Sequence, residues 1–170
     1  MQTGLLLRDI TEPDTGIGVF PAGILPYFSE RPSVDMLGKN DHIVARRATF
    51  PGANRPGHNK FDYEYSLNQH KPDLLMVLFP PSQIIEPGAL DRLALGDRAY
   101  AGQLYLNDTF QTHYAANLTF IDAIPFFIQK DSGLQEQLMT EPCELVTREV
   151  LLRLNFQMVC WPNFDQQMRQ

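Results

Sequence analysis

The apolar run from Leu74 to Phe79 (LLMVLF) constrains the fold of this chain more than any other feature. The run has the length of a strand and no polar residue that would mark a water-facing side. Strands without such alternation are typical of parallel sheets, which helices cover on both faces. We therefore expect Leu74–Phe79 to lie inside a layered α/β structure.

Segments typical of helices and strands alternate in the part of the chain that precedes this run. The predicted helices are Gln2–Ile10, His42–Arg47 and Asp62–His70, with Asp41 as the N-cap of the second. The predicted strands are Gly16–Phe20 and Ser33–Leu37. Gly23–Ser29 is a short helix or a tight turn, and the prolines and glycines of Thr49–Asn59 predict an irregular loop. This order predicts a small layered α/β fold with a mostly parallel or mixed sheet covered by helices.

Patterns are weaker after residue 80. We expect a helix at Gly88–Leu95 and strands at Thr112–Ile121, Ile124–Gln129 and Phe156–Trp161. Glu144–Leu154 suits either a helix or a strand. No repeat or low-complexity linker divides the chain, so we predict a single domain over residues 1–170.

Charge and hydropathy narrow the classes of partner. The net charge is −6, and duplex nucleic acid is not an expected partner because binding to it depends on Lys and Arg neutralising phosphates. No stretch approaches the ~18 apolar residues that a membrane span needs, and no signal peptide is evident at the N-terminus. We expect this chain, taken alone, neither to span a membrane nor to be exported.

Metal and cofactor signatures are missing from the sequence. Cys143 and Cys160 are too far apart for a CxxC motif, and either two buried thiols or a disulfide fits them. His42 and His58 lack HExxH spacing, and Gly23 is not followed by the remaining glycines of a dinucleotide fingerprint. We predict no metal site and no cofactor.

The densest polar cluster surrounds His58. Imidazole titrates near neutral pH, so His58 could exchange protons with Asp62 or Glu64 as partner, and Lys60 could hold a phosphate oxygen. A structural role fits the same residues, because Asp62 and Glu64 also suit the first turn of the following helix. No GxSxG motif supports a serine hydrolase.

Three phrases in order resemble a known family. They are Ala22–Ser29 (AGILPYFS), Asp35–Ala45 (DMLGKNDHIVA) and Pro56–Lys60 (PGHNK), followed by KPDLLMV. Together they are similar to the soluble C-terminal domain of polytopic bacterial glycosyltransferases of the GT-C superfold. Those enzymes are related to protein mannosyltransferases and arabinosyltransferases that use polyprenyl-phosphate sugars. Lys39 departs from the pattern, which usually has an apolar residue, most often leucine, at this position.

The resemblance covers about the first 80 residues, and it implies a domain on the extracytoplasmic (periplasmic) side of the membrane that sits on its own transmembrane bundle. The chain would then be excised from a larger membrane protein, with a lipid-linked sugar or a glycan acceptor as partner. The catalytic carboxylate of that superfold is expected near the first transmembrane helices, so no catalytic residue is assigned to this chain. The implied substrate-positioning surface consists of Tyr27, Asp35, Asn40, Asp41, His58 and Lys60.

Two other functions remain open from the sequence. One is a stand-alone carbohydrate- or phosphate-binding module without catalysis. The other is a small hydrolase that uses His58 with an adjacent carboxylate.

Overall fold

The computed structural model describes residues 1–77, 89–115, 117–121, 124–134, 138, 141–142 and 157–160. Its helices are α1 (Gln2–Ile10), α2 (Ile24–Ser29), α3 (His42–Ala45), α4 (Tyr63–Gln69), α5 (Ala89–Leu95), α6 (Ala99–Leu106) and α7 (Asp108–His113). Its strands are β1 (Ile17–Val19), β2 (Ser33–Asp35), β3 (Leu74–Met76), β4 (Asn117–Ile121), β5 (Ile124–Ile128), β6 (Glu141–Pro142) and β7 (Gln157–Cys160).

The strands form one mixed sheet in the order β2-β1-β3-β5-β4-β7-β6 across the described residues. β1 pairs in parallel with β2 and with β3, whereas β3 and β5 are antiparallel, with Leu74 opposite Ile128 and Met76 opposite Phe126. The predicted α/β fold with a mixed, helix-covered sheet is confirmed.

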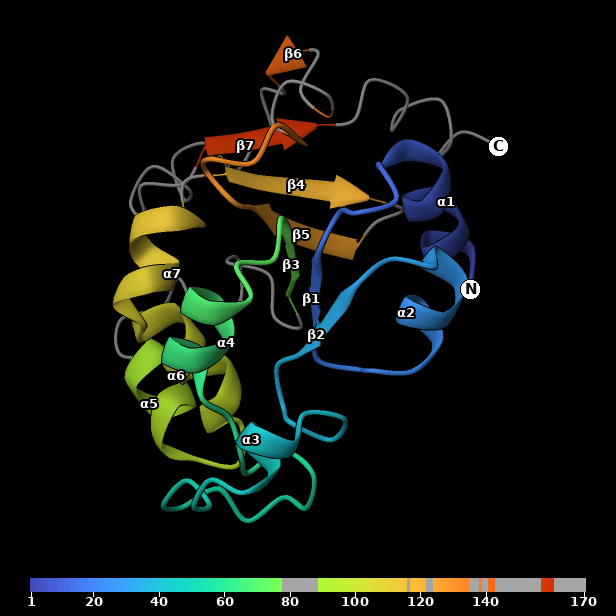
Figure 1. Cartoon of the computed structure of the whole chain (residues 1–170). Helices are drawn as coiled ribbons and strands as arrows, with labels where there is room; N and C mark the ends of the chain where they lie inside the picture. The colour runs from blue at the N-terminus through green and yellow to red at the C-terminus, as the bar shows by residue number, and fades with distance from the viewer. Residues whose placement is uncertain are drawn as a thin grey trace.

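Helices cover both faces of the sheet, α1 and α2 on one and α4 to α7 on the other (Figure 1). Alternate strand residues supply the two resulting cores. Ile17, Val19 and Leu74 pack on the side of α1 and α2, and Leu75 packs on the side of α4, α6 and α7. Both neighbours of Leu75 in β3 are also buried. The prediction of burial on both faces is therefore confirmed for β3, while Leu78 and Phe79 lie outside the described residues.

The second half differs from expectation in two places. The strand predicted at Thr112–Ile121 begins only at Asn117, because α7 occupies Asp108–His113. Asn107 starts that helix by accepting a hydrogen bond from the Phe110 amide at 3.0 Å. Phe110 is also buried, and its ring stacks on that of Tyr114.

α6 was not predicted at all. Six of its eight residues are buried and the most exposed one is Leu106, so it lacks the polar face that produces a helical period in the sequence. Gly102 lets it approach α5, because a Cβ there would lie 2.4 Å from the Ala94 backbone nitrogen.

The other predictions for the second half vary in outcome. The helix predicted at Gly88–Leu95 and the strands predicted at Ile124–Gln129 and Phe156–Trp161 correspond to α5, β5 and β7. Glu144–Leu154 and a Cys143–Cys160 disulfide fall outside the described residues. None of the described helices has both the length and the apolar character needed to cross a bilayer.

Candidate functional site

A pocket opens at the carboxyl ends of β1 and β3. From β1 the chain crosses through α2 to β2 on one side, and it then returns past β1 to β3 on the other side. The order of the strands therefore reverses at β1. In open α/β sheets, ligands bind outside the carboxyl ends of the strands at such a reversal.

The pocket is partly open and has a volume of about 540 Å³, which lies within the range of small-molecule sites. β1 leads into it through Pro21, Ala22 and Gly23, and β3 ends at it with Met76. Ile124 reaches the same edge because β5 runs antiparallel to β3 and begins where β3 ends. The remaining lining residues are Met1, Thr3, Gly4, Ile24, Leu25, Lys39 and Asn40.

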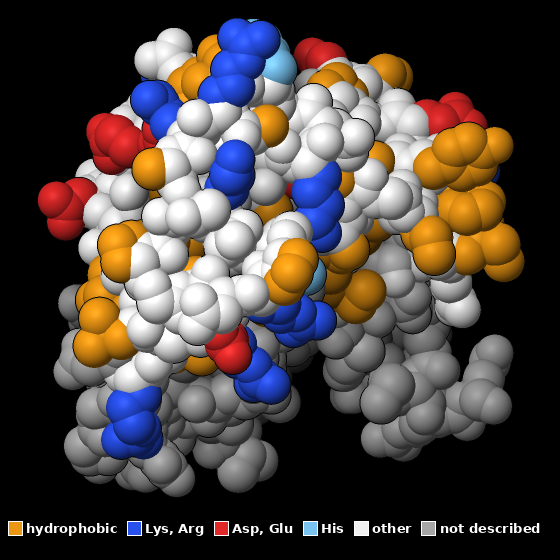
Figure 2. All heavy atoms as spheres, turned by 90° about the horizontal axis from the view of Figure 1, so that it is seen from below, with side chains coloured by type: hydrophobic (Ala, Val, Ile, Leu, Met, Phe, Trp, Pro, Cys, Tyr) orange, Lys and Arg blue, Asp and Glu red, His pale blue; other side chains and the backbone are white. Residues whose placement is uncertain are grey.

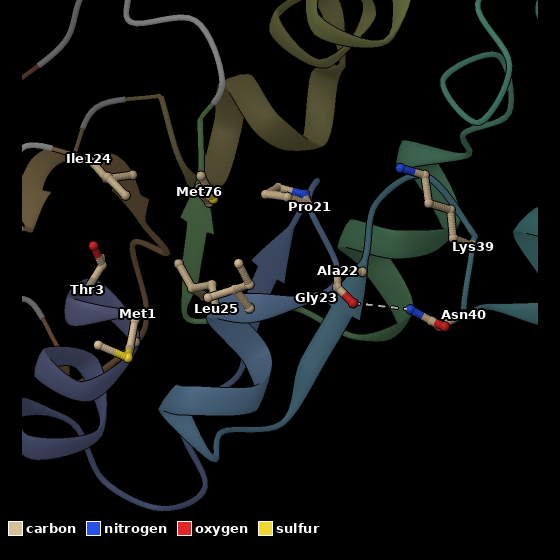
Figure 3. A pocket seen from close by; sticks show the side chains of 12 residues that line it. Met1, Thr3, Pro21, Ala22, Gly23, Leu25, Lys39, Asn40, Met76 and Ile124 are labelled. Atoms are coloured by element: carbon tan, nitrogen blue, oxygen red, sulfur yellow. Dashed lines mark hydrogen bonds between the residues drawn. The ribbon is translucent and has the colours of Figure 1, made fainter.

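Polar and apolar groups occupy different ends of this pocket. Figure 3 shows Leu25, Met76 and Ile124 on one side, and Lys39 with Asn40 on the other, beyond the backbone of Ala22 and Gly23. Apart from the Thr3 hydroxyl, the described side chains that line the apolar end carry no hydrogen-bonding groups of nitrogen or oxygen. The arrangement suits a molecule with an apolar body and one polar or anionic end.

The turn after β2 holds the polar end in place. Asp35 is buried, and its two carboxylate oxygens accept hydrogen bonds from the Leu37 amide at 3.0 Å and the Asn40 amide at 2.7 Å. Gly38 adopts φ +65°, a left-handed conformation that a side chain disfavours. The Asn40 side-chain amide then reaches the Ala22 carbonyl at 3.4 Å, which links the turn to the segment after β1.

Lys39 supplies the positive charge at this end. Its side chain is exposed and crosses the Gly57 backbone, so that a Cβ at Gly57 would lie 3.3 Å from Cε of Lys39. No carboxylate among the described residues forms an ion pair with the Lys39 amine. The amine is therefore available to an anionic group at the pocket mouth.

Asp41 performs the capping role predicted for it. One oxygen accepts from the Ile43 amide at 2.8 Å and from the Val44 amide at 3.1 Å. Its other carboxylate oxygen lies 3.8 Å from Nε2 of His70, whose ring also lies 3.1 Å from the Tyr65 hydroxyl. Burial raises the pKa of the Tyr65 phenol, and the negative charge and hydrogen bond of Asp41 raise it further. His70 was not predicted from the sequence, because it is distant from Asp41 along the chain and only the fold brings the two side chains together.

His58 and Lys60 interact with residues that do not line the pocket. The His58 ring packs on Tyr100 with 5.2 Å between centroids, and its Nδ1 lies 3.2 Å from the Pro56 carbonyl oxygen. Lys60 donates to the Ala45 carbonyl at 2.7 Å, at the opposite end of α3 from Asp41.

The carboxylates proposed as partners of His58 are engaged with other groups. Asp62 pairs with Arg47 at 2.7 Å and caps α4 through the Tyr65 amide at 2.9 Å. Glu64 hydrogen-bonds to the Asn68 side chain. Among the described residues, no carboxylate contact of His58 supports the hydrolase hypothesis, which stays a prediction.

The predicted binding residues thus divide between the pocket and its surroundings. Asn40 lines the pocket, and Asp35 accepts a hydrogen bond from the Asn40 amide. Tyr27 is exposed on α2, one turn after the lining residue Ile24. Asp41, His58 and Lys60 are not among the residues that line it, and a part for them in ligand binding stays a prediction.

The rest of the pocket was not predicted from the sequence. Lys39 could have been found from its position after a strand and a glycine. Met76 and Ile124 gave no such signal, because their meeting depends on β5 returning antiparallel to β3.

In the part of the chain that the structure describes, the other titratable groups form no second candidate site. Within the described ranges, no group of three His, Cys, Asp or Glu residues could hold a metal ion. Burial raises the pKa values of the Tyr63, Tyr105 and Tyr114 phenols, with smaller contributions from Tyr100 at Tyr63 and from Asp73 at Tyr114. The hydroxyls of Tyr63 and Tyr114 donate to the Tyr100 and Pro72 carbonyls, so these phenols are neutral parts of the core.

The sequence model of a family described as "Domain of unknown function (DUF8728)" matches residues 1–137. No curated protein and no solved structure matches the chain. The matched range includes every residue that lines the pocket.

Proposed function

We propose that this chain, which belongs to the DUF8728 family, is a substrate-positioning domain of a membrane glycosyltransferase and holds a lipid-linked sugar phosphate in the pocket at the carboxyl ends of β1 and β3. In this proposal the domain lies on the extracytoplasmic side and the catalytic carboxylate belongs to another part of the enzyme. The domain binds and orients the donor and carries out no bond-making step itself.

The observation that carries this proposal is the polarity of the pocket. Leu25, Met76 and Ile124 offer an apolar surface that suits the first isoprene units of a lipid carrier. At the other end the Lys39 amine can pair with a phosphate oxygen, and the Asn40 side chain can hydrogen-bond to a phosphate or a sugar hydroxyl. The resemblance of Ala22–Lys60 to the soluble domains of GT-C enzymes supports the choice of ligand class.

The experiment compares three probes that separate the two ends of the ligand. Geranyl phosphate, geraniol and inorganic phosphate are each titrated into the protein, and binding is followed by calorimetry. We expect geranyl phosphate to bind more tightly than either fragment, because it alone contacts both ends of the pocket. Equal binding of inorganic phosphate and geranyl phosphate would instead support a phosphate-binding module without a lipid ligand.

Variants then locate the site. Replacing Lys39 with alanine should weaken geranyl phosphate binding about tenfold, the effect of losing a charge-assisted hydrogen bond of about 1.5 kcal/mol. Lys130→Ala is the matched control, since Lys130 follows the end of β5 that lies away from the pocket, beside the start of β3. Lys60→Ala distinguishes this pocket from the cluster around His58. A tenfold loss in Lys60→Ala with none in Lys39→Ala would place the phosphate at that cluster and refute the pocket assignment.

A further inference from the structure

Large apolar side chains are exposed beside the pocket mouth. Met1, Ile24 and Tyr27 are 69%, 64% and 76% exposed, and Met1 and Ile24 also line the pocket. Ile24 and Tyr27 are one turn apart on α2, and the Tyr27 ring is held edge-on against Phe28 with 5.1 Å between centroids. Single exposed apolar residues are ordinary, but a group at the mouth of a pocket marks a contact surface.

Basic side chains are concentrated in the segment next to this group. Residues 39–60 contain one carboxylate, Asp41, and their Lys and Arg residues are Lys39, Arg46, Arg47, Arg55 and Lys60. This local excess of positive charge contrasts with the net charge of −6 for the whole chain. Figure 2, which views the molecule from the side of α3, shows Lys and Arg across this face and hydrophobic side chains gathered at its edge, on the side of α1 and α2.

Neighbouring carboxylates neutralise only part of this charge. Asp62 neutralises Arg47 by forming an ion pair with it. Asp97 also lies next to the basic segment, but it accepts a hydrogen bond from the Asn54 backbone amide at 3.2 Å. Lys39, Arg46 and Arg55 form no ion pair within the part of the chain that the structure describes. Their charges remain available to an external partner.

The apolar and the basic surfaces meet at the pocket. Lys39 lines the pocket together with Ile24, and its stem crosses Gly57 in the basic segment. Lys60 in turn fixes the end of that segment to α3 by donating to Ala45. The exposed part of α2, the pocket mouth and the basic segment therefore form one continuous surface.

We propose that this surface docks on the headgroup region of an anionic lipid bilayer. Ile24 and Tyr27 enter the interface, while Lys39, Arg46 and Arg55 contact anionic headgroups. Apolar and aromatic side chains combined with Lys and Arg are the pattern by which proteins bind bilayer surfaces without spanning them. The inference builds on the proposed function, because this docking turns the pocket mouth toward the membrane from which a lipid-linked ligand would enter.

The test is co-sedimentation with vesicles that contain no polyprenyl lipid. At low ionic strength the protein should bind vesicles of phosphatidylcholine mixed with phosphatidylglycerol. It should bind vesicles of pure phosphatidylcholine much more weakly. Added salt should release it, because the charges are exposed and salt screens them. Failure to bind the anionic vesicles would overturn the proposal.

Matched variants locate the docking surface. Arg46→Gln and Arg55→Gln should each weaken binding about fivefold, the effect expected for one basic residue near an anionic surface. Lys130→Gln, at the end of β5 away from the pocket, should leave binding unchanged. Equal losses for Lys130→Gln and Arg46→Gln would mean that binding depends on general charge, and the proposed orientation would be wrong.

The apolar contribution is tested separately. Ile24→Ser should weaken vesicle binding several-fold, because it removes an inserted apolar side chain. Leu106→Ser is the control, since Leu106 is 46% exposed on α6, on the other side of the sheet. Equal effects of the two would count against insertion of α2.

The docking proposal and the proposed function can fail independently. If geranyl phosphate binds the pocket and the protein does not bind vesicles, docking is wrong and the proposed function stands. If the protein binds anionic vesicles and geranyl phosphate does not bind the pocket, docking stands and the proposed function is wrong.

Discussion

Replacing Gly38 with alanine should destabilise the chain by about 2–5 kcal/mol. Gly38 adopts φ +65°, and a left-handed backbone costs a residue with a side chain about 1–2 kcal/mol. The new Cβ would also lie 2.5 Å from Cγ1 of Val44 and 2.9 Å from the backbone nitrogen of Ala45. Val44 is fully buried and cannot move into solvent, so the overpacking adds about 1–3 kcal/mol.

Urea unfolding followed by circular dichroism measures this cost as a shift in midpoint at constant m-value. Gly133→Ala is the matched control, because nothing lies within 4 Å of a Cβ at Gly133, and its effect should stay within about 0.5 kcal/mol. If both variants unfold at the same urea concentration, the account of how this turn is held against α3 is refuted. The turn also carries Lys39, so Gly38→Ala should weaken geranyl phosphate binding as well.

Three further predictions concern stability. Asp35→Ala should cost about 1–3 kcal/mol in urea unfolding, because the buried Leu37 amide and the partly buried Asn40 amide lose their acceptor, and Asp35→Asn should cost less; equal costs would contradict this. Asp41→Ala should cost about 1 kcal/mol through loss of the α3 cap, whereas Asp41→Asn should stay within a few tenths, and a large loss in Asp41→Asn would show that the charge matters more than the cap. The raised pKa values of Tyr63, Tyr105 and Tyr114 mean that the folded state keeps protons that the unfolded state loses above about pH 10. The free energy of unfolding should therefore be insensitive to these phenols below that pH and fall above it, by up to about 1.4 kcal/mol per pH unit for each phenol; urea midpoints that stay constant from pH 9 to pH 11 would contradict the prediction.

The front of the fold was predictable because its signals are local. The apolar face of Gln2–Ile10, together with the residues that mark where a helix starts and stops, predicts α1 with the bounds that the structure shows. Asp41 was predicted as an N-cap from its side chain and position alone, and its contacts with the Ile43 and Val44 amides confirm this. Local hydrogen bonds of this kind depend on residues a few positions apart, which a sequence displays directly.

The later elements depend on contacts that are distant in sequence. α6 is buried on nearly all sides and has no polar face, so its helical period is invisible without the helices around it. The pocket depends on Ile124 lying at the end of β3, although α5, α6 and α7 separate the two in the sequence. Asp35 and Asn40 were predictable because they lie at the end of β2 and in the turn that follows it. Met76 and Ile124 were not, because nothing near them in the sequence marks a ligand.

The position of the ligand is the most direct test of the account. Titrating geranyl phosphate into isotope-labelled protein and following backbone amide shifts would map it. We predict that the largest changes fall on Ala22, Gly23, Asn40, Met76 and Ile124, around the pocket at the carboxyl ends of β1 and β3. Changes confined to residues around His58 and Lys60, or no saturable changes at all, would contradict the account.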